Sequence, residues 1–423
     1  MNHPPAPPSR AGQADAPTPR RRHLVVLAPA AALVLAALCL RGPFAAVGPV
    51  VAGLQQELSL STAALGALTA APLVCFGLVS PLAPVLAARL GVHRAVLAGT
   101  AALTLGVAVR MGGAVGMFAG TVLLTGGIAV VNVLLPALAR AEYGDRSATV
   151  VGVITCSMAV SATLGAGLAQ PLADAVGSAR TGLALWLVPT LAAVLALALL
   201  ARARARTAPV ARPTGRGILR NRVALQVTLF FGLQSLGFYA MMAWLPAVLQ
   251  QEAGVSAVAA GGLLALGTAL GAPAALIVPP LAARRPGQGG WVLAAGLLMI
   301  VSLAGLLLAP GSAPVLWTVL YGLGTGLAFP LAMTLVLMRT RDVAQTGRLS
   351  AAAQSTGYLL AATGPLGVGL LHEATGDWGL GLAVLLALVI AQTAAGLGAA
   401  RPRLVTERTV GDQPAVAAPP AAR

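Results

Sequence analysis

Apolar stretches of about 20 residues alternate with short polar segments along most of the chain. A helix of roughly this length spans the about 30 Å hydrocarbon core of a bilayer. Strands of a membrane barrel would alternate polar and apolar residues over about 10 positions, whereas these runs are longer and evenly apolar. The pattern predicts twelve spanning helices, at about 24–53, 62–83, 94–112, 117–138, 148–171, 182–201, 223–249, 257–281, 290–310, 314–337, 349–371 and 378–400.

The sequence is internally repeated, which divides the twelve helices into two sets of six. Leu54–Glu57 (Leu-Gln-Gln-Glu) recurs 195 positions later at Leu249–Glu252, and Leu86–Arg89 recurs at Leu281–Arg284. A duplicated, strongly apolar chain is typical of a membrane transporter built from two like bundles. We therefore predict an all-α polytopic membrane protein with two pseudo-symmetric six-helix bundles. Single matches at this offset, or at 199 further along, are Ser61 with Ser256, Arg140 with Arg339, Gly165 with Gly364 and Gly177 with Gly376.

The composition requires a bilayer as solvent. Hydrophobic residues make up 58% of the chain and charged residues 9%, with a mean hydropathy of +0.87, whereas soluble proteins carry about 25% charged residues. The net charge of +16 comes from arginine, because the chain has no lysine. With a cytoplasmic amino terminus, 24 of the 27 arginines fall in tails or cytoplasmic loops, the exceptions being Arg41, Arg110 and Arg180. The positive-inside rule then places both termini in the cytoplasm.

Polar segments set the expected domain boundaries. They give a disordered cytoplasmic tail at 1–23, a first bundle at 24–201, a basic linker at 202–222, a second bundle at 223–400 and a disordered tail at 401–423. The linker carries seven arginines and no acidic residue. Basic segments beside a membrane are attracted to anionic lipid headgroups. We expect the linker to lie near the lipid bilayer, and we expect no nucleic acid partner.

Few residues offer metal, cofactor or catalytic chemistry. Cys39, Cys75 and Cys156 lie inside predicted spans without metal-ligand spacing, and the four histidines lie in a tail or at helix ends. A nucleotide-binding loop of the Walker type is impossible without lysine. We expect no cofactor, no metal and no enzymatic activity. The alternatives from a different class are a membrane enzyme, which would need clustered carboxylates or histidines at one membrane surface, and a sensor that does not transport.

Arg41 is the strongest candidate for substrate binding. It stands well inside the first predicted span, where a charge costs roughly 2.5–3.5 kcal/mol on insertion scales. A guanidinium that faces a central cavity can bind an anionic or strongly polar substrate through its planar fork of donors. The alternative is a structural arginine that caps carbonyls where Gly42 and Pro43 break the helix, or that snorkels outward. The repeat places Leu236 at the equivalent position, so the charge belongs to one half only.

None of the 11 acidic residues falls near the middle of a predicted span. Arg41 therefore has no carboxylate partner within the membrane, which leaves a substrate anion as its counter-ion. Proton coupling through a buried carboxylate is not expected. Facilitated transport, exchange, and symport that uses the substrate's own ionisation all remain open.

Further polar residues near the middle of predicted spans complete the expected pocket. Gln354 and Tyr358 are four positions apart and share one helical face. Each of these residues can instead serve as an interhelical hydrogen-bond partner. We interpret the small hydroxyl residues of the fifth span, Thr155, Ser157, Ser161 and Thr163, as packing material. The expected pocket residues are Asn132, Gln234, Ser235, Tyr239, Thr325, Gln354 and Tyr358.

Four segments together resemble one group of transporters. They are Leu40–Pro43 (LRGP), Gly232–Leu245 (GLQSLGFYAMMAWL), Phe329–Leu331, and Ala353–Pro365 (AQSTGYLLAATGP) followed by Leu371–Glu373. With twelve spans in two halves and a long basic central loop, the chain from about 24 to 400 resembles the major facilitator superfamily. Within it, these segments resemble the cyanate and 2-nitroimidazole transporter family.

The resemblance implies alternating access of the rocker-switch type around a central site lined by helices 1, 4, 7 and 10. It also implies a gating loop between helices 2 and 3 on the cytoplasmic side. Arg89 and Gly91 keep the pattern of that loop, and Arg284 repeats Arg89 in the second half. Pro84 and Ala88 stand where the superfamily has a glycine and an acid. The contacts that lock this gate are therefore expected to differ in detail.

We therefore predict a secondary active or facilitative transporter in the cytoplasmic (inner) membrane of a bacterium. Its expected substrate is a small anionic solute, either cyanate-like or a small organic anion, bound by Arg41. The alternative on the same fold is an exporter of a drug or metabolite, such as a nitroimidazole-like compound, in which Arg41 is structural. A monomer is expected.

Overall fold

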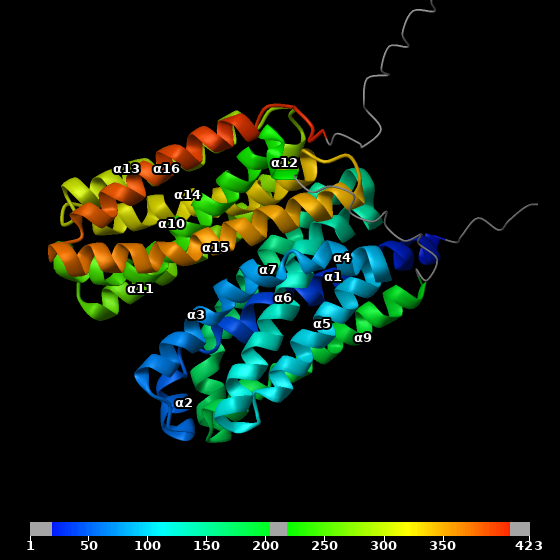
Figure 1. Cartoon of the computed structure of the whole chain (residues 1–423), viewed down its shortest axis with the longest axis horizontal. Helices are drawn as coiled ribbons and strands as arrows, with labels where there is room; N and C mark the ends of the chain where they lie inside the picture. Colours follow the sequence, from blue (N-terminus) through cyan, green and yellow to red (C-terminus); the bar gives the residue numbers. More distant parts are fainter. Residues whose placement is uncertain (1–18, 204–217, 407–423) are drawn as a thin grey trace, which may run out of the picture.

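A computed structural model describes residues 19–203 and 218–406 (Figure 1). These residues form helices and no strand. Most of the predicted tails and of the basic linker lies outside the described residues. The first part contains α1 (Pro19–Ala45), α2 (Val51–Leu58), α3 (Thr62–Val79), α4 (Leu82–Leu90), α5 (Val92–Val109), α6 (Gly113–Tyr143), α7 (Ser147–Val176), α8 (Ala179–Ala184) and α9 (Leu187–Ala203). The second contains α10 (Arg222–Ala253), α11 (Ala257–Ala269), α12 (Gly271–Ala283), α13 (Gly289–Leu308), α14 (Pro314–Met338), α15 (Val343–Thr375) and α16 (Gly379–Ala399).

Each of the twelve predicted spans coincides with one described helix or with two consecutive ones. The predicted continuous first span was wrong at its end, because α1 stops at Ala45 and a separate short helix, α2, begins at Val51. Pro49 explains the interruption, since proline has no N–H to bond the carbonyl four residues earlier, which is that of Ala45. Likewise, Pro273 lies four residues after Ala269, the last residue of α11, and has no N–H to bond the Ala269 carbonyl.

The helices form two bundles that meet at one end and splay apart at the other (Figure 1). Helices α1–α9 build the first bundle and α10–α16 the second. We call the end where α9 stops at Ala203 and α10 starts at Arg222 the linker end, and the opposite end the far end. The bundles contact each other mainly through α7 with α12, and through α15 with α3 and α6. In Figure 1 the far end carries α2 and α11, where the bundles diverge.

Residues matched across the repeat have matching structural roles. Ser61 and Ser256 both cap the start of a helix, because each hydroxyl accepts a hydrogen bond from the N–H three residues later. Gly177 and Gly376 both end a helix in the left-handed conformation, with φ of 69° and 77°, which glycine adopts without strain. The repeat thus encodes helix boundaries as well as composition.

A close crossing of α1 and α7 fixes the backbone beside Arg41. A Cβ on Gly165 would lie within 3.0 Å of three backbone atoms of Gly42, so only glycine permits this approach. The hydroxyl of Ser161 accepts a hydrogen bond of 2.7 Å from the Gly42 N–H and donates to the Leu38 carbonyl. A side chain inserted in this way between two groups of the helical ladder bends a helix. We interpreted Ser161 as packing material, but its hydroxyl hydrogen-bonds two backbone groups of α1.

Arg110 supports the same region from α5. Its side chain is buried, and it donates to the Pro43 carbonyl at 2.9 Å and to the Thr121 hydroxyl at 3.1 Å. Carbonyls near the carboxyl end of a helix carry partial negative charge, which a guanidinium stabilises. Arg110 therefore caps α1 close to its end, a role that the sequence suggested for Arg41.

We expect Gly165→Ala to lower the free energy of unfolding by about 1–3 kcal/mol, because the added methyl group overpacks the crossing of α1 and α7. Thermal unfolding of the purified protein in detergent would measure the loss. Gly167→Ala is the matched control on the same helix, since a Cβ there has no atom within 4 Å. Equal melting temperatures for the two variants would contradict the tight crossing.

Candidate functional site

A cavity of about 320 Å³ lies between the two bundles. Its wall is formed by α1 and α7 of the first bundle and by α10, α11, α12, α14 and α15 of the second. The volume falls within the range of about 300–1,000 Å³ typical of small-molecule sites. Most lining side chains are apolar, and four are aromatic: Phe238, Tyr239, Phe329 and Tyr358. The cavity is large enough for one small organic molecule.

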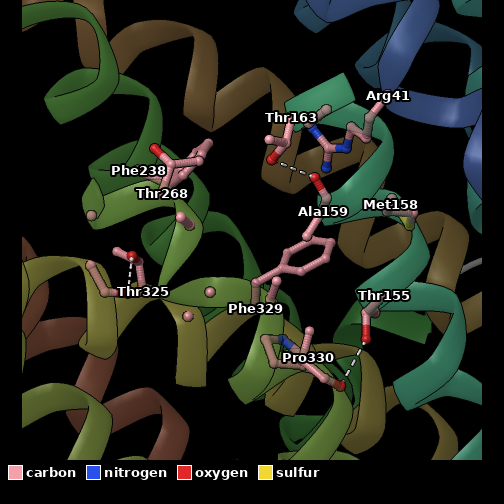
Figure 2. Close-up of a pocket in the computed structure, with 18 of the residues that line it drawn as sticks. Arg41, Thr155, Met158, Ala159, Thr163, Phe238, Thr268, Thr325, Phe329 and Pro330 are labelled. Carbon is pink, nitrogen blue, oxygen red and sulfur yellow. Dashed lines mark hydrogen bonds between the residues drawn. The ribbon is translucent and has the colours of Figure 1, made fainter. Parts of the chain in front are cut away.

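Arg41 reaches this cavity from α1 (Figure 2). Its Nη1 donates a hydrogen bond of 3.0 Å to the hydroxyl of Tyr239 on α10, in the other bundle. The guanidinium carbon lies 5.8 Å from the centre of the Phe329 ring, within the range of a cation–π interaction. The guanidinium also interacts electrostatically with the Tyr358 hydroxyl. These partners hold the cation in place without neutralising it.

The cavity brings together six of the eight expected pocket residues. Arg41, Gln234, Tyr239, Thr325 and Tyr358 all line it. Ser235, the other polar residue noted on α10, lines it too, and its hydroxyl accepts a hydrogen bond of 2.7 Å from Gln234 Nε2. The Thr325 hydroxyl donates to carbonyls of its own helix, and Figure 2 shows it apart from Arg41.

Asn132 and Gln354 are outside the set of residues that line the cavity, and they hydrogen-bond to each other across the two bundles. Asn132 Nδ2 donates to Gln354 Oε1 at 2.8 Å and to the Tyr358 hydroxyl at 3.2 Å. Gln354 Nε2 donates in turn to the Ser350 hydroxyl at 2.9 Å. The side chains of Asn132, Gln354 and Tyr358 are buried. They are interhelical hydrogen-bond partners here, and Tyr358 connects this network to the wall around Arg41.

Prolines supply several acceptors for contacts between the bundles. A proline leaves the carbonyl four residues earlier without its helical donor, and in lipid that carbonyl needs another one. Three such carbonyls accept a hydrogen bond from the opposite bundle: Gly77 from Ser355 (2.6 Å), Asn132 from Gln354 (3.3 Å) and Ala275 from Thr155 (3.1 Å), four residues before Pro81, Pro136 and Pro279.

Several residues that line the cavity were not predicted from the sequence. Thr155 and Thr163 line the cavity on α7, although they were interpreted as packing material. Thr155 also bonds the opposite bundle; in Figure 2 it lies on α7, whereas Phe329 extends from α14 of the other bundle. Phe329 appeared only within a family-like segment. The sequence showed only that Thr155 and Thr163 lie inside the fifth predicted span and Phe329 inside the tenth.

The gate residues proposed from the resemblance lie at the linker end. Arg89 and Arg284 are exposed, and Gly91 has a φ of 82°, which requires glycine. Their gating role stays a prediction. The bundles are joined at this end by Arg140, whose Nη1 donates to the carbonyl and the hydroxyl of Thr340 at 2.8 and 2.9 Å. It also donates to the Thr346 hydroxyl at 2.9 Å.

The repeat partner of Arg140 has a different function. Arg339 is buried within the second bundle, where it donates to the carbonyls of Ala399 and Ala400 and to Gln288. Arg339 therefore ties α14 to the end of α16, whereas Arg140 ties one bundle to the other. The sequence showed the repeated arginine but not this division of roles.

Residues 33–365 match the family model described as Major Facilitator Superfamily. The chain belongs to this superfamily. The match covers most of both bundles and includes every residue that lines the cavity. The fold predicted from the sequence, two pseudo-symmetric bundles of six spans, agrees with this assignment.

The chain is similar to transporters that are named for different substrates. An uncharacterized transporter of Bacillus subtilis is 36% identical over 377 residues, covering 88% of this chain and 93% of the relative. The 2-nitroimidazole transporter of Escherichia coli is also 36% identical over 377 residues, with 88% and 95% covered. The cyanate transport protein of Escherichia coli is 28% identical over 348 residues, with 82% and 90% covered. The resemblance to this family is thereby confirmed.

A solved superfamily structure shares the fold. The proton:xylose symporter bound to 6-bromo-6-deoxy-D-glucose has a TM-score of 0.72 at 13% identity, covering 90% of this chain and 98% of that one. At that identity the comparison supports the architecture alone.

Arg140→Ala is expected to loosen the linker end, because hydrogen bonds to a charged group contribute about 1.5–3 kcal/mol. An Ala137→Cys reporter, in a chain whose three native cysteines are replaced by serine, sits in this interface opposite Gly347. We expect its labelling by a maleimide to accelerate at least about tenfold in Arg140→Ala. The exposed Arg146→Ala serves as the control. An unchanged labelling rate would show that Arg140 does not hold the bundles together.

Proposed function

We propose that the protein transports a small anionic solute across the cytoplasmic membrane of a bacterium, with Arg41 as the anion-binding residue. The observation that carries the proposal is the position of Arg41: its guanidinium reaches a cavity between two bundles, and its partners there are neutral. A planar fork of donors suits a carboxylate or a similar planar anion. The relatives named for cyanate and for a putative anionic 4-hydroxy-benzoate permease support an anionic substrate.

Alternating access of the rocker-switch type fits the way the bundles touch. Arg140 and the network around Asn132 join the bundles on the linker side of the cavity. Toward the far end the bundles diverge (Figure 1). The arginine distribution supports a cytoplasmic linker end, so we describe this state as closed toward the cytoplasm. Transport then requires the bundles to rotate about the cavity, and a monomer contains all the parts that this needs.

A second candidate function is export of a neutral drug or metabolite, and the 36% identity to a 2-nitroimidazole transporter favours it. The aromatic rings in the cavity would then stack on the substrate, and Arg41 would have a structural role. The two functions differ in whether binding depends on a negative charge.

A thermal-shift screen of the purified protein distinguishes them, because a ligand that binds only the folded state raises its stability by about 2.7 kcal/mol at 100 times its Kd. The screen would compare cyanate, acetate, benzoate and 4-hydroxybenzoate with neutral benzamide and 2-nitroimidazole. We expect stabilisation by at least one anion and little by benzamide. Stabilisation by the neutral compounds alone would sink the anion proposal.

Arg41→Ala is expected to remove stabilisation by the anion while leaving the protein inserted and folded. Arg41→Lys should also weaken binding, by at least about tenfold, because an ammonium cannot make the bidentate contact. Arg202→Ala, an exposed arginine at the end of α9, controls for the loss of a positive charge. Unchanged anion binding in Arg41→Ala would show that the site lies elsewhere.

A further inference from the structure

The ionisable groups around the cavity determine what can accompany a substrate. Among the described residues that line it, Arg41 alone is charged at neutral pH. Apart from Arg41, the titratable side chains among these residues are those of Tyr239 and Tyr358. Coupling to a proton through the protein needs a group that gains and loses a proton during the cycle. The cavity offers no carboxylate or imidazole for this task.

The carboxylates of the described residues lie at helix ends, away from the cavity. Glu57 accepts hydrogen bonds from Ala179 N–H and Ser178 at the far end. Glu142 pairs with His93 at 2.6 Å near the linker end, and both side chains are only 4% exposed. None of these residues belongs to the cavity wall. The remaining described carboxylates also lie at or beyond helix ends: Asp145, Asp174, Glu252, Asp342, Glu373 and Asp377.

Several contacts that close the linker side of the cavity are hydrogen bonds between neutral groups. They consist of amide, hydroxyl and carbonyl groups, as in Asn132 with Gln354 and Ser355 with Gly77. Arg140 donates there to hydroxyl and carbonyl oxygens of Thr340 and Thr346. The Asp342 carboxylate also interacts electrostatically with Arg140 at this end, so it is the neutral hydrogen bonds that open and close without a carboxylate.

We propose that the protein moves its substrate as a monovalent anion without an accompanying proton, so that net transport is electrogenic and the membrane potential drives export. The inference rests on the proposed anion-binding role of Arg41 and adds its driving force and direction. One bound negative charge compensates Arg41 in the loaded state. A second would remain uncompensated in a largely apolar cavity, so dianions are excluded.

The direction follows from the sign of the charge. An inside-negative potential favours the outward movement of an anion, and the equilibrium ratio of outside to inside concentration is about 50-fold for each 100 mV. An importer of the same anion would need a coupled cation to overcome this bias. The cavity wall contains no acidic side chain that would bind one.

The charge distribution along the molecule favours the same direction. Arginines outnumber carboxylates at the linker end, where Glu142, Asp145 and Asp342 are the described acidic residues. The positive-inside rule accounts for this bias, but it also raises the local concentration of anions at that mouth. The far end has the opposite excess, with Glu57, Asp174, Glu252, Glu373 and Asp377 against Arg110 and Arg180.

Flux measurements on the full chain in lipid vesicles test the proposal, with radiolabelled benzoate and cyanate as probes. A potassium gradient with valinomycin sets the potential, and a pH gradient without a potential is imposed separately. We expect an inside-positive potential to drive accumulation toward about 50-fold per 100 mV, and an inside-negative potential to drive release. The pH gradient should give no accumulation beyond that of vesicles containing Arg41→Ala.

The flux measurements distinguish failure of this inference from failure of the proposed function. Arg41-dependent accumulation driven by the pH gradient and insensitive to potential would overturn the inference while leaving the proposed function intact. If neither probe shows Arg41-dependent flux, the proposed function fails and the inference fails with it. The response of the unmodified protein to the imposed potential does not depend on the folding of any cavity variant.

Gln234→Glu tests the role of the missing carboxylate directly. Gln234 lines the cavity, so an ionised carboxylate there would compete with the substrate for Arg41. We expect at least about tenfold weaker flux at pH 8, with recovery as the pH falls and the new group protonates, and flux that now responds to a pH gradient. Gln250→Glu is the matched control, because it lies exposed on the same helix near the far end. Identical behaviour of the two variants would contradict the inference.

Discussion

The pairing of every backbone polar group inside the bilayer is the constraint on which this structure depends, because lipid offers no substitute partner. A proline leaves one helical carbonyl without its donor, and the structure accommodates this in two ways. Four residues before Pro49 and Pro273 a helix ends, at Ala45 and Ala269. Four residues before Pro81, Pro136 and Pro279 the unpaired carbonyl takes a donor from the opposite bundle. The helix continues through Pro136 and Pro279, whereas α3 and α4 meet at Pro81 with a bend of 51°. Helix bending and bundle closure are thus two results of the same chemistry.

The position of Arg41 also depends on contacts to backbone polar groups. The glycine crossing of α1 and α7, the inserted hydroxyl of Ser161 and the cap that Arg110 places on Pro43 determine where its backbone lies. The second bundle keeps the crossing, since a Cβ on Gly364 would meet the Leu236 carbonyl at 2.7 Å, but it carries leucine at the repeated position. The duplicated scaffold is therefore structural, and Arg41 is one of the chemical differences between its halves.

Sequence reasoning predicted the spans and the repeat well, because hydrophobic length and offset matches depend on short-range patterns. It named Arg41, Gln234 and Tyr239, which line the cavity, since depth along a span can be counted from its ends. It could not assign Asn132 and Gln354 to the space behind the cavity, because rotation about the helix axis depends on packing between bundles. The same limit hid Thr155, whose partner is a carbonyl 120 positions away. Arg140 was visible as a repeated arginine, but only tertiary structure separates its role from that of Arg339.

The carbonyls that prolines leave free also determine the solvent of the transport path. While the bundles touch, Gly77, Asn132 and Ala275 receive donors from protein. Once the bundles separate on that side, the same oxygens lose these donors, and water is the partner that can replace them. Separation must therefore hydrate the interface along its whole length. A solute that enters or leaves on that side therefore passes three hydrated backbone oxygens.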